Sequence, residues 1–241
     1  MLKFFYAIAM VAVCNFAVAS PEKPEPLPCA VRGEITQKRV ANFIALVEKG
    51  ACSRIDITSP GGDMDAAMAM GRAIRSAQLP VQTSNPGCMS ACVLIYAAGV
   101  ERAPYGVVAI HRPYYLDTGG SMSQTADRYR LLETRVKNYL RDMNVSPNLF
   151  DRMMRIPPEE MHKMTMDEME GYEMGISDPV YMEYIAGKMA KKFGMNRLEY
   201  LDRMRVVKQN CGNPHNFSSE DKLKLIAECW NREWPGYLDS L

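Results

Sequence analysis

Hydrophobic residues in the first half of the chain follow two alternating spacings. Short apolar or alternating runs, typical of β-strands, occupy residues 31–35, 54–58, 81–83 and 107–110. The segments between them carry apolar residues at helical spacing, over residues 40–47, 66–77 and 90–98. Strands that alternate with helices predict right-handed crossover units around a largely parallel sheet, and therefore an α/β fold.

The second half of the chain has a helical pattern. One face of a long helix is traced by apolar residues at positions 132, 136, 139, 140 and 143. Further helices are predicted over residues 147–154, from Pro157 or Pro158 to near Gly175, and over residues 181–193, 198–207 and 221–230. We therefore expect an α/β domain over residues 31–180 and a helical C-terminal extension over residues 181–241.

The first nineteen residues have the layout of a secretory signal peptide. Lys3 is followed by an apolar run over residues 4–13 and then by Ala17-Val18-Ala19 at the cleavage position. The apolar run is too short to span a membrane, although a retained N-terminal anchor is an alternative. This segment predicts an exported protein, periplasmic or secreted, without stable membrane insertion. Four prolines in the next segment, residues 20–30, predict a stiff lead that is neither helix nor central strand.

Composition narrows the classes of partner. The chain has 29 basic and 28 acidic residues, so its charge gives no argument for binding nucleic acid or an anionic membrane. Histidines number only three and no Cys-x-x-Cys pair occurs, which argues against a zinc site.

Six cysteines remain once Cys14 is removed with the signal peptide. An even number of cysteines in an exported protein favours disulfides over free thiols. Pairing by proximity in sequence predicts three bridges, although six cysteines allow many other connectivities. The predicted bridges are Cys29–Cys52, Cys88–Cys92 and Cys211–Cys229.

Three motifs between Thr58 and His111 carry candidate chemistry. A strand ends in Ser59-Pro60-Gly61-Gly62, Ser90 enters an apolar helix, and His111 follows an apolar strand. A serine hydroxyl becomes a nucleophile when a base such as histidine removes its proton, and backbone amides stabilise the oxyanion that forms. Each motif also has a structural explanation: a helix cap for Ser90, a buried histidine, and a tight turn for the glycines.

Taken together, these motifs resemble the Clp protease proteolytic-subunit family, and more closely its exported relatives. The family has a Ser-Pro-Gly-Gly turn, a serine seven residues before Ala-Ala-Gly, and a histidine in Ile-His-Gln-Pro. This chain has Ser90 seven residues before Ala97-Ala98-Gly99, and Ile110-His111-Arg112-Pro113. The resemblance implies a crotonase-like fold of stacked ββα units that assembles into rings or trimers.

The resemblance also implies roles for individual residues. Ser90 would be the nucleophile and His111 the base, and the N–H groups of Gly61 (or Gly62) and Ala91 would form the oxyanion hole. The family's catalytic aspartate lies shortly before a stretch that Met164-Thr165 matches. The matching position here holds no acid, so Glu160 is the nearest choice for the third catalytic residue, although it also suits a helix N-terminus.

These observations predict an exported serine peptidase that cleaves flexible peptides or unfolded chains and forms a homo-oligomer. It would need no cofactor and no metal, and it would have no ATP-dependent unfoldase partner where ATP is absent. A catalytically silent scaffold with the same fold is one alternative. A periplasmic copper-binding protein is another, because thioethers and imidazole bind cuprous copper. Its ligands would come from Met161, His162, Met164, Met166 and Met169.

Overall fold

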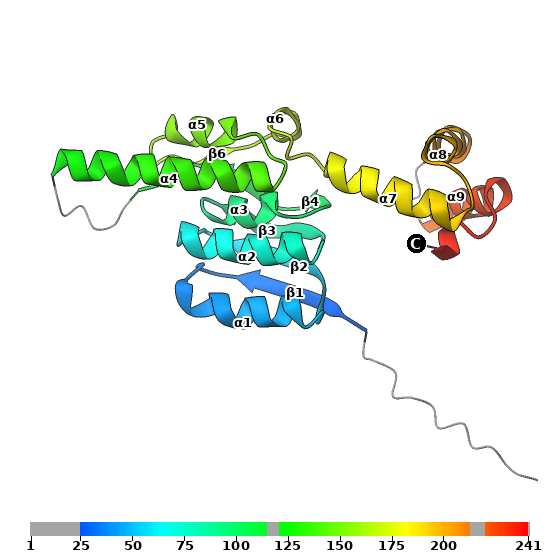
Figure 1. Cartoon of the computed structure of the whole chain (residues 1–241), viewed down its shortest axis with the longest axis horizontal. Coiled ribbons are helices and arrows are strands. Elements are labelled where there is room, and N and C mark those ends of the chain that lie inside the picture. Colours follow the sequence, from blue (N-terminus) through cyan, green and yellow to red (C-terminus); the bar gives the residue numbers. More distant parts are fainter. Residues whose placement is uncertain (1–24, 115–120, 213–219, 241) are drawn as a thin grey trace, which may run out of the picture.

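The computed structural model describes residues 25–114, 121–212 and 220–240 (Figure 1). The predicted signal peptide and the first part of the proline-rich lead lie outside the described residues.

In the described residues, strands between positions 27 and 163 form a six-stranded sheet with crossover helices. The path β1-β2-β3-β5-β6 comprises β1 (Leu27–Arg32), β2 (Cys52–Ser59), β3 (Val81–Met89), β5 (Val107–Ile110) and β6 (His162–Lys163). The short strand β4 (Arg102–Pro104) pairs with β3 off this path. Every pairing is parallel except that of β5 with β6, so the predicted α/β architecture is confirmed.

Helices close one side of this sheet in successive layers. Figure 1 shows α1 (Gln37–Glu48), α2 (Met64–Ser76) and α3 (Cys92–Ala97) stacked in chain order, with α4 (Met122–Asp142) and α5 (Asn148–Met154) above them. The helix α2 approaches α4 closely, because a Cβ at Gly71 would lie 1.8 Å from the Tyr139 hydroxyl. All six residues of α3 are buried in the main hydrophobic core, which makes α3 the centre of the domain.

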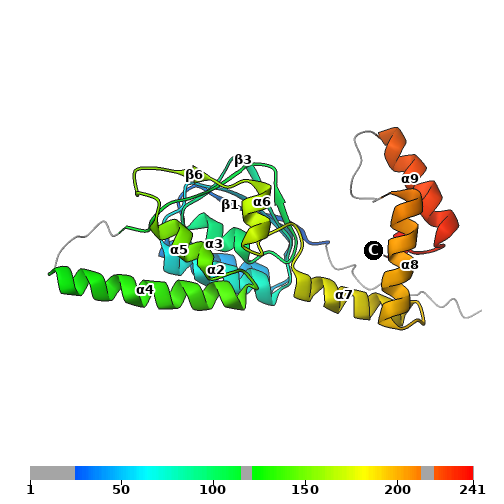
Figure 2. The ribbon, with the colours of Figure 1, turned by 90° about the horizontal axis from the view of Figure 1, so that it is seen from above.

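The C-terminal helices build a second core of their own. Figures 1 and 2 show α7 (Pro179–Lys192) leading away from the sheet to α8 (Arg197–Cys211) and α9 (Glu220–Glu233), followed by the 3-10 helix η1 (Leu238–Ser240). Aromatic residues fill this second core, with Trp230, Trp234, Tyr200 and Tyr237 all buried. The helical extension therefore has its own packing, separate from that of the sheet.

The structure shifts one strand and lengthens two others relative to their predicted limits. β1 runs from Leu27 to Arg32 instead of over residues 31–35, and so includes Pro28 of the proline-rich lead. Because β1 is the end strand of the sheet, a missing N–H is tolerated there. β2 starts two residues earlier and ends one residue later than predicted. β3 continues past Thr83 through Pro86 to Met89, since Gly87 and Cys88 pair with Val107 and Val108 of β5.

The predicted helix after Pro157 is wrong in its first half. Residues 162–163 form β6, where the Met164 N–H donates to the Val108 carbonyl oxygen. A shorter helix, α6 (Met166–Gly171), begins only after Thr165, whose hydroxyl and Glu168 make a reciprocal capping box. Strong capping at Thr165 therefore sets the start of this helix, and the preceding turn is free to pass beside β5.

All three predicted disulfides are present. Cys29–Cys52 joins β1 to β2, Cys88–Cys92 joins β3 to α3, and Cys211–Cys229 joins α8 to α9, with Cα–Cα distances of 5.3, 5.3 and 5.5 Å. Such bridges are typical of proteins that fold in an oxidising compartment. Among the described helices, none combines the length and apolar character that crossing a membrane requires.

A buried ion pair ties the sheet to the start of the extension. Asp178 is fully buried and caps α7 by accepting the Tyr181 N–H at 2.9 Å. Its carboxylate also lies 2.9 Å from Nη1 of Arg75 and 3.8 Å from Nη2 of the buried Arg102. Burial alone would raise the pKa of Asp178, but bonds from Tyr181, Asn144 and Arg75 outweigh it and hold the pKa below the usual value.

We expect Asp178→Asn to lower the free energy of unfolding by about 3 kcal/mol at pH 7, because it leaves buried guanidinium charge unpaired. The pKa of Asp178 is depressed in the folded state, so its contribution is complete above the ordinary aspartate pKa and disappears as the pH falls through the folded value. The difference in urea unfolding between wild type and variant should therefore be the same at pH 7 and pH 5.5, and should shrink as the pH falls below about 4.

Asp127→Asn is the matched control, since the Asp127–Arg130 pair is largely exposed. Equal losses of stability in the two variants would contradict the role assigned to Asp178.

Candidate active site

Ser90 lies on a tight turn between the central strand β3 and the buried helix α3. The chain leaves β3 at Met89 and α3 begins at Cys92, so the reversal is made within two residues. Ser90 adopts a left-handed φ of 57°, which is uncommon for a residue other than glycine. Its N–H donates to the carbonyl oxygen of Ala109 in β5 at 2.9 Å, which ties the turn to the strand that carries the histidine.

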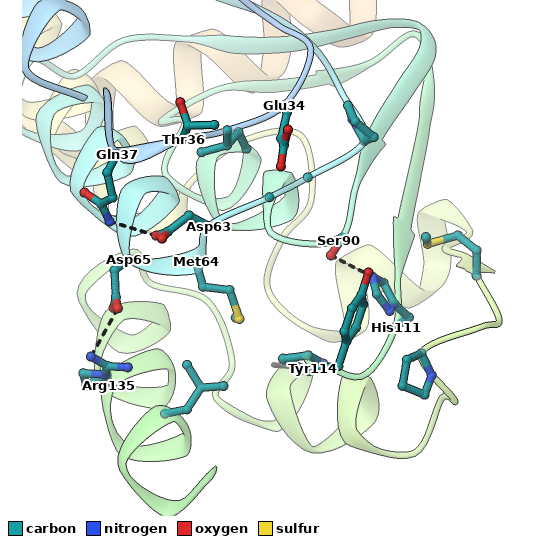
Figure 3. A pocket seen from close by; sticks show the side chains of 18 residues that line it. Glu34, Thr36, Gln37, Asp63, Met64, Asp65, Ser90, His111, Tyr114 and Arg135 are labelled. Carbon is teal, nitrogen blue, oxygen red and sulfur yellow. Dashed lines mark hydrogen bonds and ion pairs between the residues drawn. The ribbon is translucent and has the colours of Figure 1, made fainter. Parts of the chain in front are cut away.

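His111 follows β5 directly and meets Ser90. The distance between His111 Nε2 and Ser90 Oγ is 2.7 Å, a hydrogen-bond distance, and the histidine is 5% exposed (Figure 3). Neighbouring strands β3 and β5 run in parallel, so their carboxyl ends bring the two side chains to the same edge of the sheet. The structure therefore joins the two residues that are 21 positions apart in sequence.

The environment of His111 favours a neutral ring. Burial is the main cause that lowers the pKa of His111, and backbone contacts with Arg112 and Pro158 oppose it. With Ser90 donating to Nε2, the remaining proton sits on Nδ1. Nδ1 is buried and has no hydrogen-bond partner among the described residues. Because proline has no N–H, the contact with Pro158 is through its carbonyl oxygen.

Glu160 does not join this pair. Its side chain is exposed, and its N–H donates to the Pro157 carbonyl oxygen at 3.1 Å, as part of the turn that precedes β6. Glu159 is exposed as well. Pro158 and Met161, from the same turn, line the cleft instead. In the described residues, no carboxylate therefore bonds His111 from the side opposite Ser90.

The Ser59-Pro60-Gly61-Gly62 turn lies against the nucleophile. A Cβ at Gly61 would lie 2.7 Å from Ser90 Cβ and 2.8 Å from the Met89 carbonyl oxygen, and one at Gly62 would lie 2.3 Å from the Ile35 carbonyl oxygen. Both glycines have positive φ, 108° and 135°. Only residues without a side chain fit such close contacts in this conformation.

The two glycines differ in their N–H groups. The Gly61 N–H donates to the buried Ser59 hydroxyl at 3.1 Å. Among the described residues, no acceptor bonds the N–H of Gly62 or of Ala91. The N–H groups of Gly62 and Ala91 therefore remain available as donors among the described residues, whereas that of Gly61, which the resemblance implies first, is engaged.

A cleft of about 750 Å³ opens over the Ser90–His111 pair. Figure 3 shows this pair with Tyr114 at one end and the Asp65–Arg135 ion pair, 3.3 Å long, at the other. Asp63, which caps α2, accepts a hydrogen bond from Gln37 at 2.9 Å. Neither Tyr114 nor Arg135 is predicted as a site residue from the sequence. The one indication in the sequence that Tyr114 belongs to the site is its closeness to His111. No local pattern indicates that Arg135 belongs to it.

The methionines named for copper binding are divided between the core and the cleft. Met164 and Met169 are buried in the main core, whereas Met161 is partly exposed in the cleft. His162 Nε2 lies 2.8 Å from Glu168 Oε1 and is engaged there. In the part of the chain that the structure describes, no group of three or more His, Cys, Asp or Glu residues could hold a metal ion.

A comparison with known protein families matches the region that contains the candidate active site. A model of the Clp protease family matches residues 27–183, which include every described strand and the residues that line the cleft. A search of the curated proteins found no match.

The burial of His111 predicts the pH dependence of Ser90 reactivity. The base must be neutral to accept the serine proton, and its pKa lies below 6.5. The rate of reaction with a fluorophosphonate, measured by quenched labelling from pH 4.5 to pH 8.5, should therefore rise with pH to a plateau, with its midpoint below pH 6.5.

His111→Ala provides the control and should remove this dependence. A midpoint above pH 7 in the wild-type protein would contradict a base that is buried and lacks a carboxylate partner.

Proposed function

The chain belongs to the Clp protease family, and from that membership and the 2.7 Å contact between Ser90 and His111 we propose that it is a serine peptidase. The contact is the observation that carries the proposal, because a serine hydroxyl reacts with a peptide carbonyl only when a base takes its proton.

The first chemical step would be acylation of Ser90. Oγ forms a bond to the carbonyl carbon, its proton passes to Nε2 of His111, and the carbonyl electron pair moves onto oxygen. When the tetrahedral intermediate collapses, the C–N bond breaks and Nε2 returns the proton to the leaving amine. Water then hydrolyses the ester, again with His111 as the base, and regenerates Ser90.

Backbone amides would stabilise the oxyanion in both halves of the reaction. Gly62 and Ala91 are favoured as donors, since their N–H groups have no acceptor among the described residues, whereas the Gly61 N–H is engaged with Ser59. Losing one such donor typically slows a reaction about a hundredfold. The buried Ser59 hydroxyl would then fix the turn by accepting the Gly61 N–H, and the Gly62 N–H would bind the substrate oxyanion.

The proposed substrates are flexible peptides or unfolded chains. Residues from the starts of α1 and α2 and from α4 line the cleft, and Ile35, Met64 and Leu132 would supply apolar contacts beside the polar residues. The three disulfides support an exported enzyme, periplasmic or secreted, and an ATP-dependent unfoldase is not expected in such a compartment. No cofactor enters the mechanism.

A homo-oligomer is part of the proposal. The helix α4 extends beyond the sheet in Figure 1, and it exposes Met122 and Leu131, which are 92% and 65% accessible. Exposed apolar side chains on a projecting helix suit contact with another copy of the chain.

A catalytically silent scaffold is the second candidate. The unpartnered Nδ1 of His111 favours it, because a histidine without an orienting carboxylate is a less efficient base.

Labelling with a fluorophosphonate, followed by peptide mapping, distinguishes the two functions. We expect an adduct on Ser90 in the wild type, none in Ser90→Ala, and labelling at least about a hundredfold slower in His111→Ala. Cleavage of an unfolded protein substrate should fall in the same order.

Ser123→Ala is the matched control, because Ser123 is exposed on α4 and, among the described residues, its hydroxyl bonds a neighbouring serine hydroxyl and no group of the site. It should label like the wild type. An assembled wild-type protein without an adduct on Ser90 would refute the peptidase and favour the scaffold.

A further inference from the structure

A disulfide joins two cysteines that lie on either side of the nucleophile Ser90 in the sequence. Cys88 and Cys92 are joined, both are fully buried, and the residues between them are Met89, Ser90 and Ala91. Cys88 belongs to β3, where it pairs with Ser59 of β2 on one side and Val108 of β5 on the other. Cys92 is the first residue of α3. The bridge therefore connects the strand before Ser90 to the helix after it.

The cross-link restricts the path of the chain between its ends. Four residues of extended strand would separate the two Cα atoms by about 13 Å. The observed distance is 5.3 Å, so the chain must reverse inside the loop. Ser90, with φ at 57°, provides the reversal, in a conformation that a serine rarely adopts by preference.

The same reversal positions two groups of the proposed active site, the Ser90 hydroxyl and the Ala91 N–H. With Ser90 left-handed, its Oγ lies 2.7 Å from His111 Nε2, and the Ala91 N–H has no other acceptor among the described residues. Gly61 packs against Ser90 Cβ and Met89, so the glycine turn also rests on this loop. A shift of about 1 Å in such a geometry is enough to slow a reaction about a hundredfold.

We propose that the Cys88–Cys92 disulfide is a positioning element of the active site, which holds Ser90 in its left-handed conformation against His111. The inference rests on the proposed function. The other contacts of the turn, such as the Ser90 N–H bond to Ala109, keep part of the population in place when the bridge is absent. Removal of the disulfide should therefore weaken the reaction without abolishing it.

The chain offers a matched control in its second disulfide. Cys29–Cys52 has the same Cα–Cα distance of 5.3 Å but joins β1 to β2 at the end of the sheet, away from Ser90. The test compares Cys88→Ala/Cys92→Ala with Cys29→Ala/Cys52→Ala by the kinetics of fluorophosphonate labelling. Thermal unfolding of each variant fixes a temperature at which all proteins remain folded.

We expect the Cys88/Cys92 variant to lower the maximal labelling rate about 30- to 100-fold, with the half-saturating concentration of the probe unchanged. The control variant should lose thermal stability while both labelling constants stay within about twofold of the wild type. Wild-type rates in the Cys88/Cys92 variant, or losses that track the unfolding temperature in both variants, would overturn the proposal.

Hydrogen exchange supplies a readout that does not depend on catalysis. The peptide covering residues 88–92 should exchange faster in the Cys88/Cys92 variant than in the control, and unchanged exchange there would overturn the proposal. If the wild type does not label while this exchange difference is present, the peptidase function is refuted. The Cys88–Cys92 disulfide is then shown to order the turn without serving a reaction. Cys88→Val/Cys92→Ala, which refills the core volume, replaces the first variant if that protein does not fold.

Discussion

The left-handed turn at Ser90 is the constraint on which the rest of the site depends. It directs the chain from the central strand into the buried helix α3 and places the hydroxyl against His111. The turn is possible because the residue that faces it has no side chain, since a Cβ at Gly61 would lie 2.7 Å from Ser90 Cβ. The Cys88–Cys92 bridge encloses it, and the Ala109 carbonyl oxygen accepts its N–H. An uncommon backbone conformation therefore coincides with the candidate reaction centre.

Buried polar contacts fix the helix that follows this turn. Tyr139 of α4 donates its hydroxyl to the Leu94 carbonyl oxygen at 2.6 Å, and Arg102 donates to the Ala97 carbonyl oxygen at 2.9 Å. Burial lowers the pKa of Arg102 to about 10, so its guanidinium remains charged near neutral pH and forms an ion pair with the Asp178 carboxylate. Asp178 in turn caps α7. The start of the C-terminal extension is thus connected through buried charge to α3, the helix that follows the nucleophile's turn.

The sequence predicted those features that local patterns encode. Apolar periodicity located β2, α2 and β5, and their alternation predicted the parallel sheet that brings Ser90 and His111 to one edge. The three disulfides were predictable for the same reason, since each joins cysteines that are near each other in the sequence. The short strands β4 and β6 have no period to detect, and β3 continued past Pro86 because pairing with β5 outweighed a local turn pattern. Glu160 was chosen by position in sequence, whereas three-dimensional packing placed Pro158 and Met161 at the cleft.

The crystal structure of the protein after reaction with a fluorophosphonate tests the central claim most directly. We expect a phosphonyl group on Ser90 Oγ, with φ of Ser90 still left-handed and His111 Nε2 within hydrogen-bond distance of the adduct. The phosphoryl oxygen should accept hydrogen bonds from the N–H groups of Gly62 and Ala91. An adduct on another serine, or a Ser90 turned away from His111 with its φ negative, would refute the proposed site.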